Sequence, residues 1–128
     1  MLFKYNDMKR YLFLLLFTVF FTFVVYSQPA GFWVMAICEG IENMHGKRVA
    51  SLVYAGLVGS LDYVEINPHR NPSKPEKDTI EKYTFTILDM VLMLIKQGND
   101  NSTIIDIIAG TYLDRKLMRE SFLVFWNR

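Results

Sequence analysis

The chain has 128 residues, 52% of them hydrophobic, and a formal net charge of +1. This length allows one domain at most. Residues 28–128 hold 11 Lys and Arg against 12 Asp and Glu, so they offer no electrostatic case for binding nucleic acid. The apolar excess lies toward the N-terminus, because no charged residue stands between Arg10 and Glu39.

Residues 1–27 have the composition of a secretory signal peptide. A basic start precedes sixteen mostly apolar residues at positions 11–26, and small Ser27 then stands shortly before Pro29. This order of basic, apolar and small residues is typical of a cleaved signal. We expect cleavage after Ser27, which leaves 28–128 as one domain. The basic residues are Lys4, Lys9 and Arg10.

Two alternatives for this segment stay open. Met8 could be the true start, because the signal that would begin there is tighter. The segment could also remain as an uncleaved anchor, although sixteen residues fall short of the ~20 that span a bilayer as a helix. We therefore expect a periplasmic or extracellular protein, or alternatively a membrane-anchored one that meets the membrane through this segment only.

The domain begins with two predicted helices. Residues 32–44 have apolar side chains at helical spacing, and Gly46 is a reasonable stop. Residues 47–64 carry a second apolar stripe, beside which small residues recur four apart and would let another helix approach closely. The first stripe is Trp33, Ile37, Ile41 and Met44, the second is Val49, Val53, Leu57, Leu61 and Val64, and the small residues are Ser51, Ala55, Gly56, Gly59 and Ser60.

A polar segment at 67–77 with three prolines predicts a loop. It is locally basic, and it is either a solvated connection or a partner-binding loop, since long ordered loops are often functional. Its basic residues are His69, Arg70, Lys74 and Lys77.

Two further helices are predicted after this loop. The spacing of Asp78 and Glu81 favours a capping box that starts a third helix, which runs to Gln97 and is capped by Gly98. Its expected buried stripe is Ile80, Tyr83, Ile87, Val91 and Leu94.

A fourth helix is expected to start at Ser102 and to continue through 115–119. Asp106 should face outward, and the run at 122–126 is of uncertain type. The residues expected to face inward are Ile104, Ile105, Ile108 and Tyr112. We therefore predict an all-α fold, a small bundle of about four helices.

Candidate chemical sites are few. Glu42 and His45 have the Glu-x-x-His spacing of helical di-iron sites, with Glu39 one step before them, but no second such unit occurs in the sequence. A solvated helix face is the favoured interpretation. Asp62 and Glu65 could form an acidic pair, although exposed side chains are the more common case. We predict no catalytic, cofactor-binding or metal-binding residues and no enzymatic activity.

A single cysteine, Cys38, excludes an intramolecular disulfide. We expect it to be buried as a small apolar residue. An intermolecular disulfide or a reactive thiol remains the alternative. Trp33 and Trp126, near the two ends of the predicted mature chain, could be interface anchors.

One family resemblance rests on the layout of the domain. Cys38 is followed by the segment 56–62 (GLVGSLD), by a proline-containing loop and by two apolar helices. This layout resembles the Rap/Tai-type immunity proteins of type VI secretion systems, small exported helical proteins that bind and block a cell-wall-degrading amidase toxin. Leu57, Gly59 and Asp62 match the aliphatic, glycine and acidic positions of the family motif.

The chain also departs from that family. Gly56 stands where an aromatic residue is usual, and Val53 is near the position of a second cysteine, which this chain lacks. The resemblance implies a protein partner, which would be a toxin, and no catalysis. The residues carried over as structural positions are Cys38, Leu57, Gly59 and Asp62, and no toxin-contacting residue is assigned.

Three functions are therefore carried forward. The first is an exported helical protein that binds and blocks a protein partner through the loop at 67–77 and nearby helix ends, as an immunity protein would. The second is a membrane-anchored accessory subunit of a larger envelope assembly, packed through the small-residue face at 51–60. The third is a small metal-binding protein or enzyme that uses Glu42 and His45.

Overall fold

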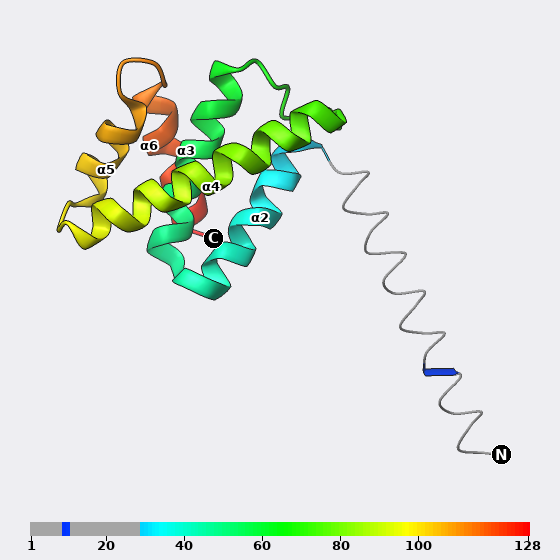
Figure 1. The fold of residues 1–128 in the computed structure, drawn as a ribbon, viewed down its shortest axis with the longest axis horizontal. Coiled ribbons are helices and arrows are strands. Elements are labelled where there is room, and N and C mark those ends of the chain that lie inside the picture. The colour runs from blue at the N-terminus through cyan, green and yellow to red at the C-terminus, as the bar shows by residue number, and fades with distance from the viewer. Residues whose placement is uncertain (1–8, 11–28) are drawn as a thin grey trace.

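The computed structural model describes residues 9–10 and 29–128, and the domain in this part of the chain consists of five α-helices without a strand (Figure 1). The prediction of an all-α fold is confirmed. The predicted signal peptide and its cleavage site lie outside the described residues, apart from Lys9 and Arg10. The helices are α2 (Ala30–His45), α3 (Lys47–Tyr63), α4 (Lys74–Lys96), α5 (Asn101–Ala109) and α6 (Arg115–Trp126).

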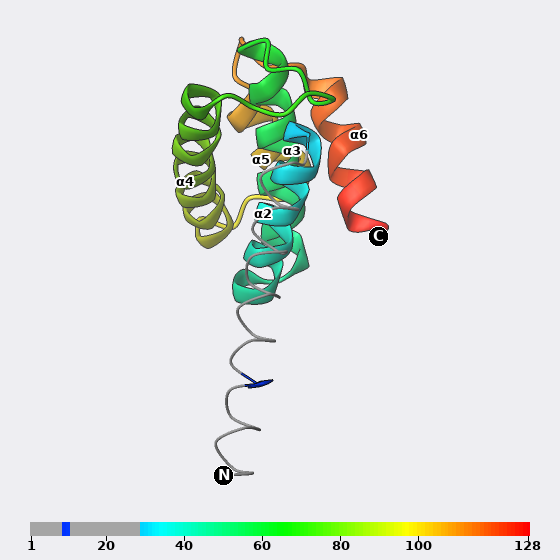
Figure 2. The ribbon, with the colours of Figure 1, turned by 90° about the vertical axis from the view of Figure 1, so that its right-hand side faces the viewer.

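Helix α3 is the centre of the bundle. It contacts each of the other four helices, and α4 and α6 lie on opposite sides of it (Figure 2). Eleven of its 17 residues are buried, as expected of a helix that is covered on all sides. None of the five helices is both long and apolar enough to cross a membrane.

The small residues of α3 are where the neighbouring helices come closest. A Cβ atom added to Gly56 would lie 2.8 Å from Cγ2 of Ile87 on α4, and one added to Gly59 would lie 2.9 Å from Cγ of Met118 on α6. Both glycines therefore make room for a side chain of a neighbouring helix, which confirms the prediction that another helix approaches closely here. The expectation that this face packs on a larger assembly is wrong, because the small residues are buried inside the bundle.

On α2, the buried stripe is shifted from the predicted one. Trp33 and Ile37 are only half-buried, and Met44 is 79% exposed. The reason is that α2 packs on α3 with one face, and the position of α3 decides which of two overlapping apolar stripes is covered. Met44 lies in the last turn, beside the connection to α3. The residues that α2 buries are Ala30, Val34, Cys38 and Ile41.

Helix α4 follows its predicted stripe at four positions and departs from it at one. Thr84 is buried in place of Tyr83, which is half-buried. The hydroxyl of Thr84 donates to the carbonyl oxygen of Ile80 at 2.7 Å, so burial leaves this polar group hydrogen-bonded. The four predicted residues that are buried are Ile80, Ile87, Val91 and Leu94.

The predicted start of α4 is wrong by one turn. The helix begins at Lys74, where Ser73 accepts a hydrogen bond from the amide of Glu76 at 3.3 Å and the Glu76 carboxylate accepts from the amide of Ser73 at 2.9 Å. This capping box satisfies two amides that a helix start leaves open, and Pro75 is tolerated in the first turn because its position needs no N–H donor. Asp78 is therefore inside the helix. The C-terminal end agrees with the prediction, since Gly98 has φ +86° after the last turn.

The predicted fourth helix is two helices. Asp100, not Ser102, caps α5 by accepting from the amide of Thr103 at 2.8 Å. The chain then turns after Ala109, and Asp114 starts α6 by accepting from the amide of Leu117 at 3.0 Å. The predicted continuation through 115–119 is wrong, because this turn lets α6 fold back onto α3.

The break between α5 and α6 decides which residues around it are buried and which are exposed. Tyr112 lies in the turn and is 74% exposed, contrary to its predicted inward position. The run at 122–126 forms the end of α6, with Phe122 and Phe125 buried. Ile104 and Ile105 are buried as predicted, and Ile108 is half-buried.

Candidate functional site

The loop between α3 and α4 is tied to the start of α2, and both lie at the same end of the bundle (Figure 1). The amide of Ala30 donates to the carbonyl oxygen of Arg70 at 2.9 Å, and the amide of Gly31 donates to that of Pro68 at 2.9 Å. The first amides of a helix have no partner within the helix. The loop therefore supplies the acceptors that cap α2, and it is held in place by doing so.

The second half of the loop is fixed by α4. Pro72 is buried, and Arg70 forms an ion pair with Glu76 at 3.1 Å. The same Glu76 closes the capping box, and its hydrogen bonds with Ser73, first that from the backbone amide, lower the pKa of its carboxyl group. One acidic side chain thus holds both the loop and the start of the helix.

The four predicted binding residues of this segment are divided between the loop and the helix. His69 and Arg70 are exposed on the loop. Lys74 is exposed in the first turn of α4, and Lys77, which follows it, is half-buried with its Nζ 5.4 Å from the centre of the Trp33 ring. Three basic side chains therefore face solvent at this end of the bundle, and the fourth covers a tryptophan. We call the surface of residues 67–74 the loop face.

A pocket of about 490 Å³ opens under the base of the loop. It is formed by the start of α2, the second half of α3, the turn after α3 and the first turn of α6. Asp62 and Glu65 line it, and both are exposed. Its other lining residues are Gly31, Val34, Tyr54, Val58, Leu61, Ile66, Asn67, Pro68 and Leu117.

Glu65 has an unusual backbone at the edge of this pocket. Its φ is +59°, and no other non-glycine residue in the described part of the chain has a positive φ. The amide of Ile66 donates to the backbone carbonyl oxygen of Leu61 at 2.9 Å, and the amide of Glu65 donates to the backbone carbonyl oxygen of Asp62 at 3.2 Å. This is the Schellman end of a helix, in which glycine usually takes the left-handed position. A glutamate here places a carboxylate at the pocket at some cost in backbone strain.

The residues that carry the family resemblance have two different environments. Cys38 and Leu57 are fully buried, and Gly59 is packed against Met118. Asp62 instead lies at the pocket. The first three positions therefore contribute to the core, and only the acidic position is available to a ligand.

The predicted burial of Cys38 is confirmed. Burial raises the pKa of its thiol to about 12, and the positive charge of Arg128 opposes this rise only in part. The pKa of Tyr54 is also raised, first by burial and then by its proximity to Cys38. A thiol in this state is protonated at neutral pH, so it is a poor nucleophile.

The Glu39, Glu42 and His45 side of α2 faces the C-terminus of the chain. Arg128 forms ion pairs with Glu39 at 2.8 Å and with Glu42 at 3.7 Å. His45 is exposed at the last position of the helix. Within residues 9–10 and 29–128, no three His, Cys, Asp or Glu side chains are grouped so that they could hold a metal ion.

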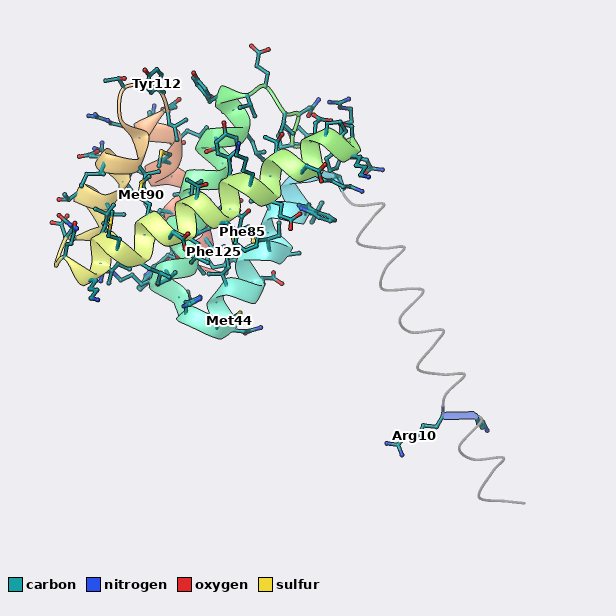
Figure 3. All side chains as sticks on the ribbon, in the orientation of Figure 1. Arg10, Met44, Phe85, Met90, Tyr112 and Phe125 are labelled. Atoms are coloured by element: carbon teal, nitrogen blue, oxygen red, sulfur yellow. The ribbon has the colours of Figure 1, made fainter. Side chains whose placement is uncertain are left out.

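A second, smaller groove of about 270 Å³ lies between the end of α3, α4 and the turn after α5. Tyr63 and Tyr112 meet edge to face at its rim, with ring centres 6.0 Å apart. Figure 3 shows Tyr112 at this turn, and Phe85, which is 61% exposed, on the outer side of α4. The groove carries no charged lining residue, so its character is apolar and aromatic.

Of the predicted anchors, Trp33 is half-buried under Lys77, and Trp126 is 41% exposed and stacked on Phe122.

Sequence reasoning missed the pocket, whose lining comes from separate segments of the chain. The positive φ of Glu65 also had no signal in the sequence.

Comparisons with protein-family models, with curated proteins and with solved structures found no match to this chain.

Proposed function

We propose that this chain is an exported, all-helical protein that binds a partner protein through the loop face and blocks it. The observation that supports the proposal most strongly is the attachment of the loop to α2 by the hydrogen bonds from Ala30 and Gly31. The same hydrogen bonds cap α2, so they hold the loop in one conformation before any partner binds.

The physical advantage of such a loop is that it loses little freedom on binding. Ordering a flexible loop subtracts from the affinity of a complex, and a loop that is ordered beforehand avoids most of this cost. His69, Arg70 and Lys74 are exposed on this ordered backbone. They would steer and contact an acidic surface of the partner.

The kind of partner follows from the family resemblance. An immunity protein of the Rap/Tai type would cover the active site of a cell-wall amidase toxin in the periplasm. Blocking by coverage needs no catalytic residue in this chain. The predicted signal peptide would deliver the protein to the compartment in which such a toxin acts.

Co-expression with the product of the adjacent gene tests this proposal. The product is directed to the periplasm, and cell growth is compared with and without this chain. We expect that product to arrest growth, and this chain to restore growth and to co-purify with the product. A neighbouring product that is neither toxic nor bound contradicts the immunity function.

Variants of the loop face test where the partner binds. The double variant His69→Ala/Lys74→Ala removes two exposed side chains that form no ion pair among the described residues. We expect it to weaken binding at least tenfold, as truncation of contact residues at an interface often does. Lys96→Ala/Lys116→Ala, at exposed sites on α4 and α6, is the matched control and should bind as the unaltered protein does.

Export is tested by the mass of the protein recovered from the periplasm. The proposal expects a chain that begins at Gln28. A full-length chain in the membrane fraction would instead support the anchored subunit.

A further inference from the structure

The pocket beside the loop face combines an apolar lining with two carboxylates. Val34, Val58 and Leu117 contribute apolar walls from three different helices. Asp62 and Glu65 add acidic groups near the opening, and among the described residues neither forms an ion pair. The volume of about 490 Å³ lies within the range of roughly 300–1,000 Å³ that is usual for ligand sites.

We propose that this pocket receives a basic side chain of the partner protein, an arginine or a lysine. Such a side chain has an aliphatic stem that would pack on the apolar wall and a cationic head that would pair with the two carboxylates. This inference rests on the proposed function, since it assigns a contact in the same complex.

The position of the two carboxylates at the C-terminal end of α3 further favours a cationic group in the pocket. The C-terminal end of a helix carries a partial negative charge, which favours a positive group there and disfavours an acidic one. The last turn of α3 contains Asp62 and no basic residue, and Glu65 follows directly after it. Three sources of negative potential therefore meet at one opening.

The segment between α3 and α4 contains one arginine and no lysine, and this arginine already has an acidic partner. Arg70 forms its ion pair with Glu76 on α4. An incoming cation would thus not have to displace another cation from Asp62 or Glu65. An anionic ligand would be repelled at this opening, and a purely apolar one would gain nothing from the two acids.

The backbone of Glu65 supports the same assignment. Glycine would be the unstrained residue at φ +59°. A glutamate here instead places a charged side chain beside the pocket. The carboxylate is also held on an ordered turn, because the amides of Glu65 and Ile66 both donate to carbonyl oxygens of α3.

Titration with small probes tests the pocket without knowledge of the partner. The protein is purified in the form in which it accumulates, and its backbone amide resonances are followed by NMR. The probes are butylguanidinium, its neutral counterpart butylurea, and the anion pentanoate. We expect butylguanidinium to shift the resonances of Gly31, Val58 and Leu117, and to bind about threefold to fivefold more tightly than butylurea, as ion pairs with exposed carboxylates do.

Variants separate the contribution of the two carboxylates to probe binding from that of the cavity. In Asp62→Asn/Glu65→Gln the preference for butylguanidinium over butylurea should disappear. In Glu81→Gln, which alters an exposed carboxylate on α4, the preference should remain. Leu117→Trp fills the pocket from its wall and should abolish the binding of both probes while the carboxylates are retained.

The outcomes also separate this inference from the proposed function. No shift in the pocket, equal affinity for butylguanidinium and butylurea, or an unchanged preference in Asp62→Asn/Glu65→Gln overturns the inference. A partner that binds the unaltered protein and the double variant equally well overturns it too, while the proposed function stands. If butylguanidinium binds as expected and the adjacent gene product does not bind, the pocket stands and the proposed function fails.

Discussion

The backbone of Gly31 lies directly against that of Pro68: the amide of Gly31 donates to the Pro68 carbonyl oxygen at 2.9 Å, and a Cβ on Gly31 would lie 3.1 Å from the same oxygen. The start of α2 and the loop after α3 are thereby joined into one surface. The pocket lies beside this contact, since both residues line it.

Alanine at three glycines should have three different effects on the free energy of unfolding. Gly40 has no neighbour within 4 Å of an added Cβ, so Gly40→Ala should stabilise α2 by about 1 kcal/mol through helix propensity. Gly56→Ala should destabilise by roughly 1–3 kcal/mol, because the buried, β-branched Ile87 cannot turn aside. Gly59→Ala should fall between them, because Met118 is flexible. Urea denaturation of the three variants measures the order, and a stabilising Gly56→Ala would contradict the packing.

Removing the cap of α4 should show where this helix begins. Ser73→Ala should cost about 1 kcal/mol of stability, the usual value for loss of an N-cap side chain. Asp78→Ala is the matched control, since Asp78 lies within the helix, and its effect should stay within about 0.5 kcal/mol. The two unfolding midpoints are compared in urea. A larger loss for Asp78→Ala than for Ser73→Ala would place the start of the helix one turn later.

Replacement of Glu65 should reveal its backbone strain. Glu65→Gly should stabilise the protein by about 1 kcal/mol, because glycine adopts a positive φ without a steric penalty. Glu65→Ala retains the Cβ atom and should show no such gain, although it removes the same carboxylate. Thermal unfolding of both variants distinguishes backbone strain from charge, since equal stabilisation by the two would assign the effect to the carboxylate.

The thiol of Cys38 should be unreactive in the folded protein. At pH 8 a disulfide reagent should modify it only as fast as the chain opens, because it is buried and has a pKa of about 12. Reaction at the rate of a free thiol would contradict its burial.

The same group makes stability depend on alkaline pH. An unfolded thiol loses its proton near pH 9.0 and the folded one near pH 12, so between these values the unfolded state binds fewer protons. The stabilising contribution is complete below about pH 9 and is lost as the pH rises, by up to about 1.4 kcal/mol per pH unit. The loss should be smaller in Cys38→Ala, which also controls for the titration of Tyr54. Identical slopes for the two proteins above pH 9 would contradict the raised pKa.

The sequence was sufficient for the helical class and for most helices, because helical periodicity is a local property. It did not determine which of two apolar stripes on α2 is covered. Val34, Ile37, Cys38 and Ile41 are all apolar, and only the placement of α3 selects among them. Met44 has the spacing of the predicted buried stripe, but it is exposed because it lies in the last turn of the helix.

The errors at helix ends have a different cause, which is competition between local signals. Both Ser73 and Asp78 precede a glutamate by three residues, and the prolines before Asp78 favoured the later start. Gly110 and Asp114 are ordinary stop and start signals for helices. They separate α5 from α6, so local signals for this break are present in the sequence.

The pocket could not have been predicted in this way. Its walls come from α2, α3, the following turn and α6, and only tertiary packing brings them together. Asp62 and Glu65 were correctly expected to be exposed. Their position beside an apolar cavity is a property of the fold.

Hydrogen exchange at Ala30 and Gly31 in the protein without a partner tests the account most directly. If the loop is built into the bundle, these two amides should exchange far more slowly than an unstructured chain, with protection comparable to that of amides inside α2. Exchange at the rate of an unstructured chain would show that the loop does not cap α2, and it would contradict the pre-ordered binding face on which the proposed function depends.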